Sequence, residues 1–404
     1  MDHPAARADF WRQSHDVAGE GTASEPWIAI NPHRPEDAAG LAEFARSRDT
    51  TRSLLYFQTS GSEGVPKWVG LSRAACLASA QAVNAHLEST AADRWLIPLP
   101  LHHVGGFSIL ARCHASGASF HHWQDRWSPH EFASHCTGHR ITLTSLVPTQ
   151  LHDLVQARLE APAHLRAIVV GGGALARETG LRALELGWPV LQSYGMTETA
   201  SQVATEPLEH LRAGFDPDSL EVLPCLELAT AEDGALIVRG KSLAAGYAVK
   251  RDNAWHWEPI DPTQGLRTRD RVQLWQHGTR RFLRFLGRES SFVKVLGELV
   301  SLPEMQRRLE SVLQACGTDP RSAIIWPVSD PRKDTRLVLV GEGSVSALEG
   351  TRVRFNEAAA GYERLDAVFS VDALPRTALG KVDTMHLQRL IVGSRHAPDT
   401  SAQF

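Results

Sequence analysis

Short apolar runs alternate with longer amphipathic stretches through the first half of the chain. Four of these runs, each bounded by turn residues, predict buried strands: RWLIPLP from Arg94, ITLTSLVP from Ile141, RAIVVGGG from Arg166 and PVLQSYG from Pro189. The stretches between them have helical spacing, and ALARETGLRALELG ends on Gly187, a residue type that favours a helix C-terminus. This alternation predicts an α/β fold built on a parallel, doubly wound sheet.

The pattern changes after about Pro224. ELATAEDGALIVRG predicts a β-hairpin that turns at Glu232–Gly234, and further short strands follow it. A helix is expected from Pro303, because proline suits the first turn of a helix, and two more strands and a terminal helix complete the pattern. We therefore expect two domains, a large one over residues 1–287 and a small α+β one over residues 288–404.

Length and composition narrow the function classes. The 404 residues exceed one ordinary core, and a formal net charge of −4 argues against a general nucleic-acid binder. No apolar run is long enough to span a membrane, and the first residues lack the apolar core of a signal peptide. The five cysteines form no C-x-x-C pair, which is typical of reduced thiols. We expect a cytoplasmic protein without membrane insertion. The oligomeric state stays open, a homodimer included.

One loop is rich in groups that hold phosphate. It lies within YFQTSGSEGVPKWVG, after a predicted buried strand and before a helix that Ser72 would cap. Its glycines let backbone N–H groups point inward, and its hydroxyls and lysine add donors. The spacing is neither that of a P-loop nor G-x-G-x-x-G, so an ordinary Ser/Gly surface turn is the alternative. The candidate phosphate ligands are Thr59, Ser60, Gly61, Ser62, Gly64 and Lys67.

The same loop carries a carboxylate, Glu63. A carboxylate about 5 Å from a phosphate charge would cost roughly 3 kcal/mol at an effective dielectric near 20. We therefore expect Glu63 to point outward, to pair with Lys67, or to reach phosphate through a bridging cation. A loop that binds no phosphate is the remaining alternative.

Polar, glycine-rich segments also follow the other predicted strands: PLHHVGG, GGGAL and SYGMTET. Ligands of doubly wound sheets bind at the C-terminal ends of the strands, so these segments are candidate binding loops. A metal site is an alternative, because six metal-ligating side chains lie close together in sequence. They show no recognised zinc spacing, and adjacent histidines on a strand point to opposite faces. The six are His102, His103, Cys113, His114, His121 and His122.

Six motifs, taken in order, resemble one enzyme family. TSGSEGVPK, GGGAL, QSYGMTE, TRD, GRESSFVK with GELVSLPEM, and PRTALGK occur in the order and approximate spacing of the adenylate-forming enzymes. These enzymes include acyl- and aryl-CoA synthetases, peptide-synthetase adenylation domains and luciferases, and the resemblance covers roughly residues 54–390. Within the family, PLHHVGGFSILAR, TSLVPTQL and PVLQSYGMTETASQ resemble stretches of the o-succinylbenzoate–CoA ligases of menaquinone synthesis.

The resemblance implies an AMP-forming acid–CoA ligase that uses ATP, Mg²⁺ and coenzyme A. A carboxylate attacks the α-phosphorus of ATP to give an acyl-adenylate and pyrophosphate, and a thiol then displaces AMP. Such chemistry depends on positioning and charge neutralisation more than on covalent catalysis. The implied substrate is a small-molecule aryl carboxylic acid, o-succinylbenzoate. Three alternatives stay open: another aryl or acyl acid, a carrier-protein thiol as acceptor, and a catalytically silent nucleotide-binding homologue.

The resemblance also implies roles for individual residues. Thr197 would donate to the α-phosphate, Glu198 would hold Mg²⁺, and Lys381 of the mobile small domain would stabilise the oxyanions of adenylation. Besides the phosphate loop, the nucleotide would contact Gly171, Gly172, Gly173, Ser193, Tyr194, Gly195, Met196, Thr197, Asp270 and Arg288. The acyl group would contact His103, Gly106, Ser145 and Thr149.

These residues have ordinary interpretations too. Tyr194 could be a core tyrosine, Glu198 a charge at a helix N-terminus, and Asp270 a turn residue. Arg288 and Lys381 could be solvated surface charges.

The sequence departs from the family pattern in places. Glu63 replaces the usual threonine, TRD replaces T-G-D, and the residues after Lys381 lack a common arginine. GRESS replaces G-R-x-D-D, which puts Ser290 at the hinge about which the small domain would rotate.

Overall fold

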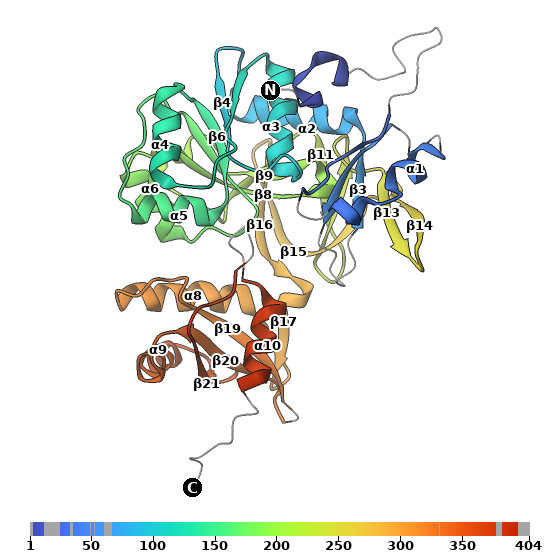
Figure 1. Ribbon diagram of the computed structural model, residues 1–404. Coiled ribbons are helices and arrows are strands. Elements are labelled where there is room, and N and C mark those ends of the chain that lie inside the picture. The colour runs from blue at the N-terminus through green and yellow to red at the C-terminus, as the bar shows by residue number, and fades with distance from the viewer. Residues whose placement is uncertain are drawn as a thin grey trace. The chain divides into compact units, whose positions relative to one another are not determined.

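The computed structural model describes residues 3–11, 25–32, 35–48, 50–51, 53–59, 67–330, 332–376 and 382–394. The chain forms two compact units (Figure 1). The first comprises residues 1–268 and 272–285, and the second comprises residues 269–271 and 286–404. The division therefore crosses two long strands, β15 (Leu266–His277) and β16 (Arg280–Arg288), rather than a loop.

An eleven-stranded mixed sheet organises the first unit. Its order is β11-β12-β15-β16-β10-β9-β8-β7-β6-β4-β5. The five strands from β8 to β5 run parallel, whereas β9 and β10 pair antiparallel with their neighbours and β11 pairs antiparallel with β12. The bounds are β4 (Arg94–Ile97), β5 (Ser119–His122), β6 (Leu143–Leu146), β7 (Ala167–Val170), β8 (Val190–Met196), β9 (Ser201–Thr205), β10 (Leu220–Val222), β11 (Leu226–Thr230) and β12 (Ala235–Gly240).

Helices cover both faces of the parallel strands. One apolar core joins α2 (Arg73–His86) and α3 (Val104–Ser116) to one face. A second core joins α4 (Pro129–Gly138), α5 (Pro148–Gln156) and α6 (Arg177–Glu185) to the other, as Figure 1 shows. Trp95 and Leu96 are adjacent in β4 and belong to different cores, because successive strand residues point to opposite faces.

A smaller sheet completes the first unit. It has the order β1 (Trp27–Ile28), β2 (Leu55–Thr59), β3 (Lys67–Leu71), β13 (Gly246–Arg251) and β14 (Ala254–Pro259). Apolar residues of β2 and β3 join the core of α2 and α3, so these two helices are packed between two sheets. The short helices α1 (Leu41–Arg46) and α7 (His210–Ala213) belong to the same unit.

The second unit is a small α+β assembly. Its three-stranded sheet contains β19 (Ala323–Asp330), β20 (Asp334–Glu342) and β21 (Leu365–Val371), and β17 (Phe292–Val295) pairs with β18 (Glu298–Ser301). Helices α8 (Leu302–Ala315) and α9 (Val345–Glu357) share a core with one face of this sheet. Helix α10 (Thr384–Ser394) shares a separate core with other residues of β20.

The predicted fold class is confirmed: a large unit with an α/β sheet and a small α+β unit. One expected element order is wrong. The sequence suggested a strand, a phosphate loop and a helix in succession, but β3 lies between the loop and α2. Strands β2 and β3 form an antiparallel pair in which Thr59 is opposite Lys67, because the apolar residues after Lys67 extend the sheet. Among the described residues, every helix is too short or too polar to cross a membrane.

Candidate active site

A sharp turn between β8 and β9 holds the segment predicted to contact nucleotide. Thr197–Thr199 forms one 3₁₀ turn, and φ is +57° at Ala200 and +121° at Ser201, which is uncommon for residues other than glycine. A Cβ atom on Gly195 would lie 1.8 Å from the carbonyl oxygen of Ser201, so only glycine fits there. Strained backbone of this kind gathers at functional sites, where the surrounding structure has to impose it.

Glu198 lies in this turn and faces side chains from the five-stranded sheet. The phenol of Tyr247, on β13, donates to Oε1 of Glu198 at 3.2 Å. Nζ of Lys67, the first residue of β3, lies 5.6 Å from the centroid of the Tyr247 ring. Burial, and then the charge of Glu198, raise the pKa of Tyr247, so the phenol stays a neutral donor. Lys67 and Glu198 are thus grouped around a tyrosine that the sequence did not single out.

Two predicted nucleotide contacts on β8 use their side chains differently. The ring of Tyr194 is half-buried and stacks on Phe285, with ring centroids 5.4 Å apart. The hydroxyl of Ser193 is buried, donates to the carbonyl of Ala204 at 3.3 Å and accepts from Thr205 at 3.1 Å. The Ser193 side chain therefore holds β8 against β9, which leaves its backbone as the part that could face a ligand.

The loop of Gly171, Gly172 and Gly173 is shaped by a buried glutamine. Nε2 of Gln192 donates to the carbonyls of Val170 and Gly173 at 3.2 and 3.3 Å, and its Oε1 accepts from the Leu175 N–H at 2.9 Å. Gly172 has a φ of +80°, which suits glycine. The loop also lies against the start of α5, where Thr149 occupies the first turn.

A buried acid, Glu206, holds Gln192 in place through a hydrogen bond. Its fully buried carboxyl group accepts from the Gln192 N–H at 2.9 Å, and its Oε1 lies 3.2 Å from Nδ1 of His210. Burial raises the pKa of Glu206. The glycine loop is thus fixed by a chain of hydrogen bonds that runs back to a buried acid.

Of the predicted acyl residues, His103 and Gly106 lie at the start of α3, Ser145 lies on β6, and Thr149 lies in α5. His103 is the N-cap residue of this helix, and its ring lies beside that of His102, with centroids 4.4 Å apart. A Cβ atom on Gly106 would lie 2.5 Å from the Pro100 carbonyl oxygen. Glycine at this position therefore lets the helix approach the chain that leaves β4.

A buried arginine, Arg112, links this helix to two strands. It donates to Ser108 at 3.0 Å, and to Ser145 of β6 and Ser201 of β9 at 3.4 Å each. Its guanidinium lies 5.3 Å from the Trp95 ring centroid, and its Nε has no hydrogen-bond partner among the described residues. Burial lowers the pKa of Arg112 to about 10, so it stays charged at neutral pH. A buried, positively charged guanidinium therefore lies 3.4 Å from the hydroxyl of Ser145.

Asp270 and Arg288 are paired within the second unit. Nε of Arg288 lies 3.1 Å from Oδ1 of Asp270, whose side chain is only 8% exposed, against 65% for Arg288. Asp270 lies inside β15, so the turn interpretation of this residue is wrong. A buried carboxylate beside an exposed arginine is suited to accept hydrogen bonds from hydroxyl groups.

Comparison with known proteins identifies the family. Residues 14–248 match the family model of the AMP-binding enzymes. The 2-succinylbenzoate–CoA ligase of Bacillus velezensis is 30% identical over 365 residues, which cover 85% of this chain and 70% of that protein. The chain belongs to the AMP-binding, adenylate-forming enzyme family. The predicted recognition is therefore confirmed, and the chain is an AMP-forming acid–CoA ligase by family.

Solved structures of this family agree with the fold. The o-succinylbenzoate CoA synthetase of Bacillus subtilis, in complex with the acyl-adenylate intermediate OSB-AMP, matches with a TM-score of 0.70 and 27% identity, covering 87% of this chain and 70% of that one. The Bacillus subtilis enzyme in complex with ATP and magnesium ion matches with a TM-score of 0.68 and 29% identity, covering 83% and 69%.

Some predicted site residues of this adenylate-forming enzyme lie outside the described residues. They are Ser60, Gly61, Ser62, Glu63 and Gly64 of the phosphate loop, and Lys381. The described ends of the phosphate loop meet across β2 and β3, where the hydroxyl of Thr59 donates to the Lys67 carbonyl at 3.4 Å. Ser290 lies in the 3₁₀ turn Glu289–Ser291 that follows β16.

Sequence reasoning missed four residues that shape the site: Arg112, Gln192, Glu206 and Tyr247. Arg112 and Gln192 stand inside the quoted stretches PLHHVGGFSILAR and PVLQSYG, but nothing in the pattern marks their burial. Tyr247 lies between Gly246 and Ala248 in a strand that was not predicted, so no feature of the sequence pointed to it.

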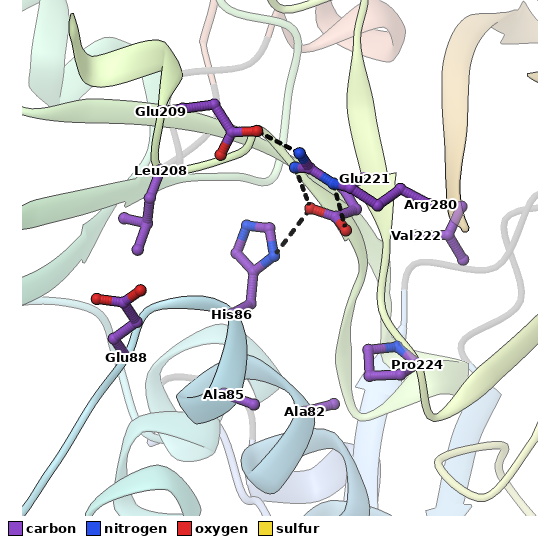
Figure 2. Close-up of a pocket in the computed structure, with 10 residues that line it drawn as sticks. All are labelled: Ala82, Ala85, His86, Glu88, Leu208, Glu209, Glu221, Val222, Pro224 and Arg280. Atoms are coloured by element: carbon purple, nitrogen blue, oxygen red, sulfur yellow. Dashed lines mark hydrogen bonds and ion pairs between the residues drawn. The ribbon is translucent and has the colours of Figure 1, made fainter. Parts of the chain in front are cut away.

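Residues that the sequence did not predict line a pocket of about 320 Å³ (Figure 2). Arg280 holds both carboxylate oxygens of Glu221, at 2.9 and 2.6 Å, and also bonds Glu209. Nδ1 of His86 lies 3.8 Å from Glu221. The charges that line the pocket are thus mostly paired with one another, and none of the predicted site residues is among them.

Proposed function

We propose that this enzyme joins o-succinylbenzoate to coenzyme A through an acyl-adenylate. The observation that carries the proposal is the likeness to the Bacillus subtilis synthetase that holds OSB-AMP, which extends over 87% of this chain. ATP, Mg²⁺ and CoA would be the other reactants. The large domain, 1–287, would bind nucleotide and acid, and the small one, 288–404, would supply Lys381.

The nucleotide would be bound by charges that the first unit already groups together. Lys67 would neutralise phosphate, and Glu198 would hold Mg²⁺. Glu198 fits this ion, because Mg²⁺ prefers carboxylate oxygens, and a carboxylate has lone pairs beyond the one that accepts from Tyr247. Tyr247 would orient that carboxylate. Thr197 would donate to the α-phosphate from the strained turn, and Tyr194 would lie against the adenine ring.

The acid would lie against His103, Gly106, Ser145 and Thr149. o-Succinylbenzoate carries two carboxylates, one to be activated and one that stays charged. The buried charge of Arg112 behind Ser145 supports a dianionic acid, because a cation in a low-dielectric site attracts a second carboxylate. This feature favours o-succinylbenzoate over a simple benzoate.

Asp270 would accept the ribose hydroxyls, with Arg288 beside it, and Lys381 would stabilise the charge that develops during adenylation. Rotation about Ser290 would then replace Lys381 with a face that admits CoA. These roles come from the family resemblance and from the pairing of Asp270 with Arg288.

Glu63 supports one competing proposal, a homologue that binds ATP without turnover. Pyrophosphate release from ATP, measured with o-succinylbenzoate, benzoate and short acyl acids, with and without CoA, separates the two. We expect release with o-succinylbenzoate and a CoA thioester product. Release with a different acid only would contradict the substrate. The competing outcome is that the protein binds ATP and releases no pyrophosphate with any acid. If Glu63→Thr then restored pyrophosphate release, Glu63 would be the residue that prevents turnover.

A further inference from the structure

Three histidines outside the candidate active site gather at one edge of the large sheet. His121 lies on the edge strand β5, His135 lies in α4, and His139 is the C-cap residue of that helix. One ring nitrogen of each lies within 4.8 Å of the others. We propose that His121, His135 and His139 form a binding site for one divalent transition-metal ion such as Zn²⁺.

The backbone brings these side chains together. His135 and His139 are four residues apart, so they lie on one helix face with the H-x₃-H spacing of many zinc sites. The N–H of His139 donates to the carbonyl of His135 at 3.0 Å, which keeps the chain helical up to this pair. His121 faces them from β5, with its ring centroid 5.3 Å from that of His135. The third ligand, His121, therefore comes from a strand, and the other two come from one helix.

A small rearrangement would complete the coordination geometry. Nitrogens on a tetrahedral zinc ion, at about 2.0–2.1 Å from the metal, lie about 3.3 Å apart. The rings of His121 and His139 are stacked, with centroids 3.8 Å apart and planes 19° from parallel, so their nitrogens do not yet converge. His139 is exposed, and the χ2 angle of histidine is broad, so one ring can turn without disturbing the core.

The donor set selects the class of ion. Three imidazoles suit Zn²⁺, Co²⁺, Ni²⁺ or Cu²⁺, whereas Mg²⁺ prefers oxygen ligands, so the proposed nucleotide metal would not compete. A fourth position would remain for water.

The ion would fasten the edge of the sheet. His135 lies 5.4 Å, ring to ring, from Trp123, which packs in the core beneath α4. An ion held by His121 and His135 would tie β5 to α4 at a strand that, among the described strands, has a neighbour on one side only. None of the three histidines belongs to the candidate active site, so the proposed role is structural.

The test is a Co²⁺ titration of the full-length protein after chelator treatment, followed by displacement with Zn²⁺. We expect visible d–d absorption that saturates at one equivalent and disappears as Zn²⁺ binds. His139→Ala removes an exposed ligand and should weaken Zn²⁺ binding at least about 100-fold. His130→Ala is the matched control, an exposed histidine of the same helix outside the cluster, and should change it less than about two-fold.

A thermal measurement gives a second readout. Zn²⁺ should raise the Tm of the wild type and of His130→Ala, and should leave the Tm of His139→Ala unchanged, because an ion that binds only the native state stabilises it. The proposal is overturned if the wild type shows no saturable Co²⁺ absorption. It is equally overturned if His139→Ala, folded by circular dichroism, binds Zn²⁺ as tightly as the wild type, which would locate the ion elsewhere.

Discussion

Tyr247 holds the carboxylate of Glu198 through one phenol hydrogen bond of 3.2 Å. Tyr247→Phe removes only that bond and should lower kcat/KM for ATP by about 10- to 100-fold, the usual effect of losing a group that orients a metal ligand. The apparent Mg²⁺ affinity should fall with it. Steady-state kinetics at several Mg²⁺ concentrations measure both quantities.

Tyr56→Phe is the control for this change. Tyr56 is a buried tyrosine of the same five-stranded sheet, but its hydroxyl donates to the Thr51 carbonyl, away from Glu198. It should leave the Mg²⁺ dependence unaltered. An unchanged Mg²⁺ dependence in Tyr247→Phe would mean that Glu198 is not held for a metal.

Arg112 is the residue on which the proposed preference for a dianionic acid depends. Arg112→Met removes the buried charge behind Ser145 at similar side-chain length. We expect kcat/KM for o-succinylbenzoate to fall by about 10- to 100-fold more than kcat/KM for a monocarboxylic aryl acid, because a lost hydrogen-bonded charge costs about 1.5–3 kcal/mol. The ratio of the two kcat/KM values is the measurement.

A second buried arginine separates specificity from folding. Arg73 bonds the carbonyls of Phe10 and Ser53 at 2.6 and 2.7 Å, far from the predicted acyl residues in sequence. Arg73→Met should reduce stability and leave the ratio of kcat/KM values alone. If both variants changed the ratio alike, Arg112 would be structural only.

At the level of elements, the strained turn between β8 and β9 is the feature most open to test. Gly195→Ala places a Cβ atom 1.8 Å from the Ser201 carbonyl, so the hairpin has to shift. We expect adenylation to fall by about 100-fold or more, since a displacement near 1 Å can cost that much. Pyrophosphate release measures this loss.

Gly350→Ala is the control for that substitution. Gly350 lies inside α9 with open space around it, so alanine should be neutral or should stabilise the helix by up to about 1 kcal/mol. Normal adenylation in Gly195→Ala would show that the turn tolerates movement.

Helix α8 carries a pH-dependent element. Burial raises the pKa of Glu310 to about 6 from an unfolded value of 4.5. The raised value means that this group favours folding fully below pH 4.5, and that roughly 2 kcal/mol is lost as the pH rises through 6. Glu310→Gln stays neutral and should unfold in urea with a smaller loss of stability between pH 5 and pH 7.5. An identical pH dependence in both proteins would contradict the burial of this carboxyl group.

The sequence predicted the parallel strands well, and the physical reason is local. Each apolar run between turn residues is long enough for one buried strand, and the helices between them have a clear period. The segment after Lys67 was harder to predict, because its apolar residues form strand β3 and extend a sheet, whereas the sequence suggested that the loop leads directly into a helix. Asp270 resembled a turn residue in sequence, yet pairing within a long strand buries it.

For the whole molecule, the sequence indicated many of the residues of the site, but it did not indicate which of them contact one another in the fold. Lys67, Glu198 and Tyr247 come from segments far apart in the sequence, and only the packing of the smaller sheet against the rest of the first unit groups them. The same holds for Arg112, whose three serine partners lie on a helix and two strands. No single-sequence pattern encodes contacts of this kind.

We propose that this chain activates o-succinylbenzoate as an adenylate. The most direct test mixes excess enzyme with ATP, Mg²⁺ and o-succinylbenzoate, without CoA, and measures the product of one turnover by mass spectrometry. We predict o-succinylbenzoyl-AMP in stoichiometric amount, its conversion to the CoA thioester when CoA is added, and its loss in Lys381→Ala. The absence of any adenylate from wild-type enzyme that binds ATP would contradict this proposed activity.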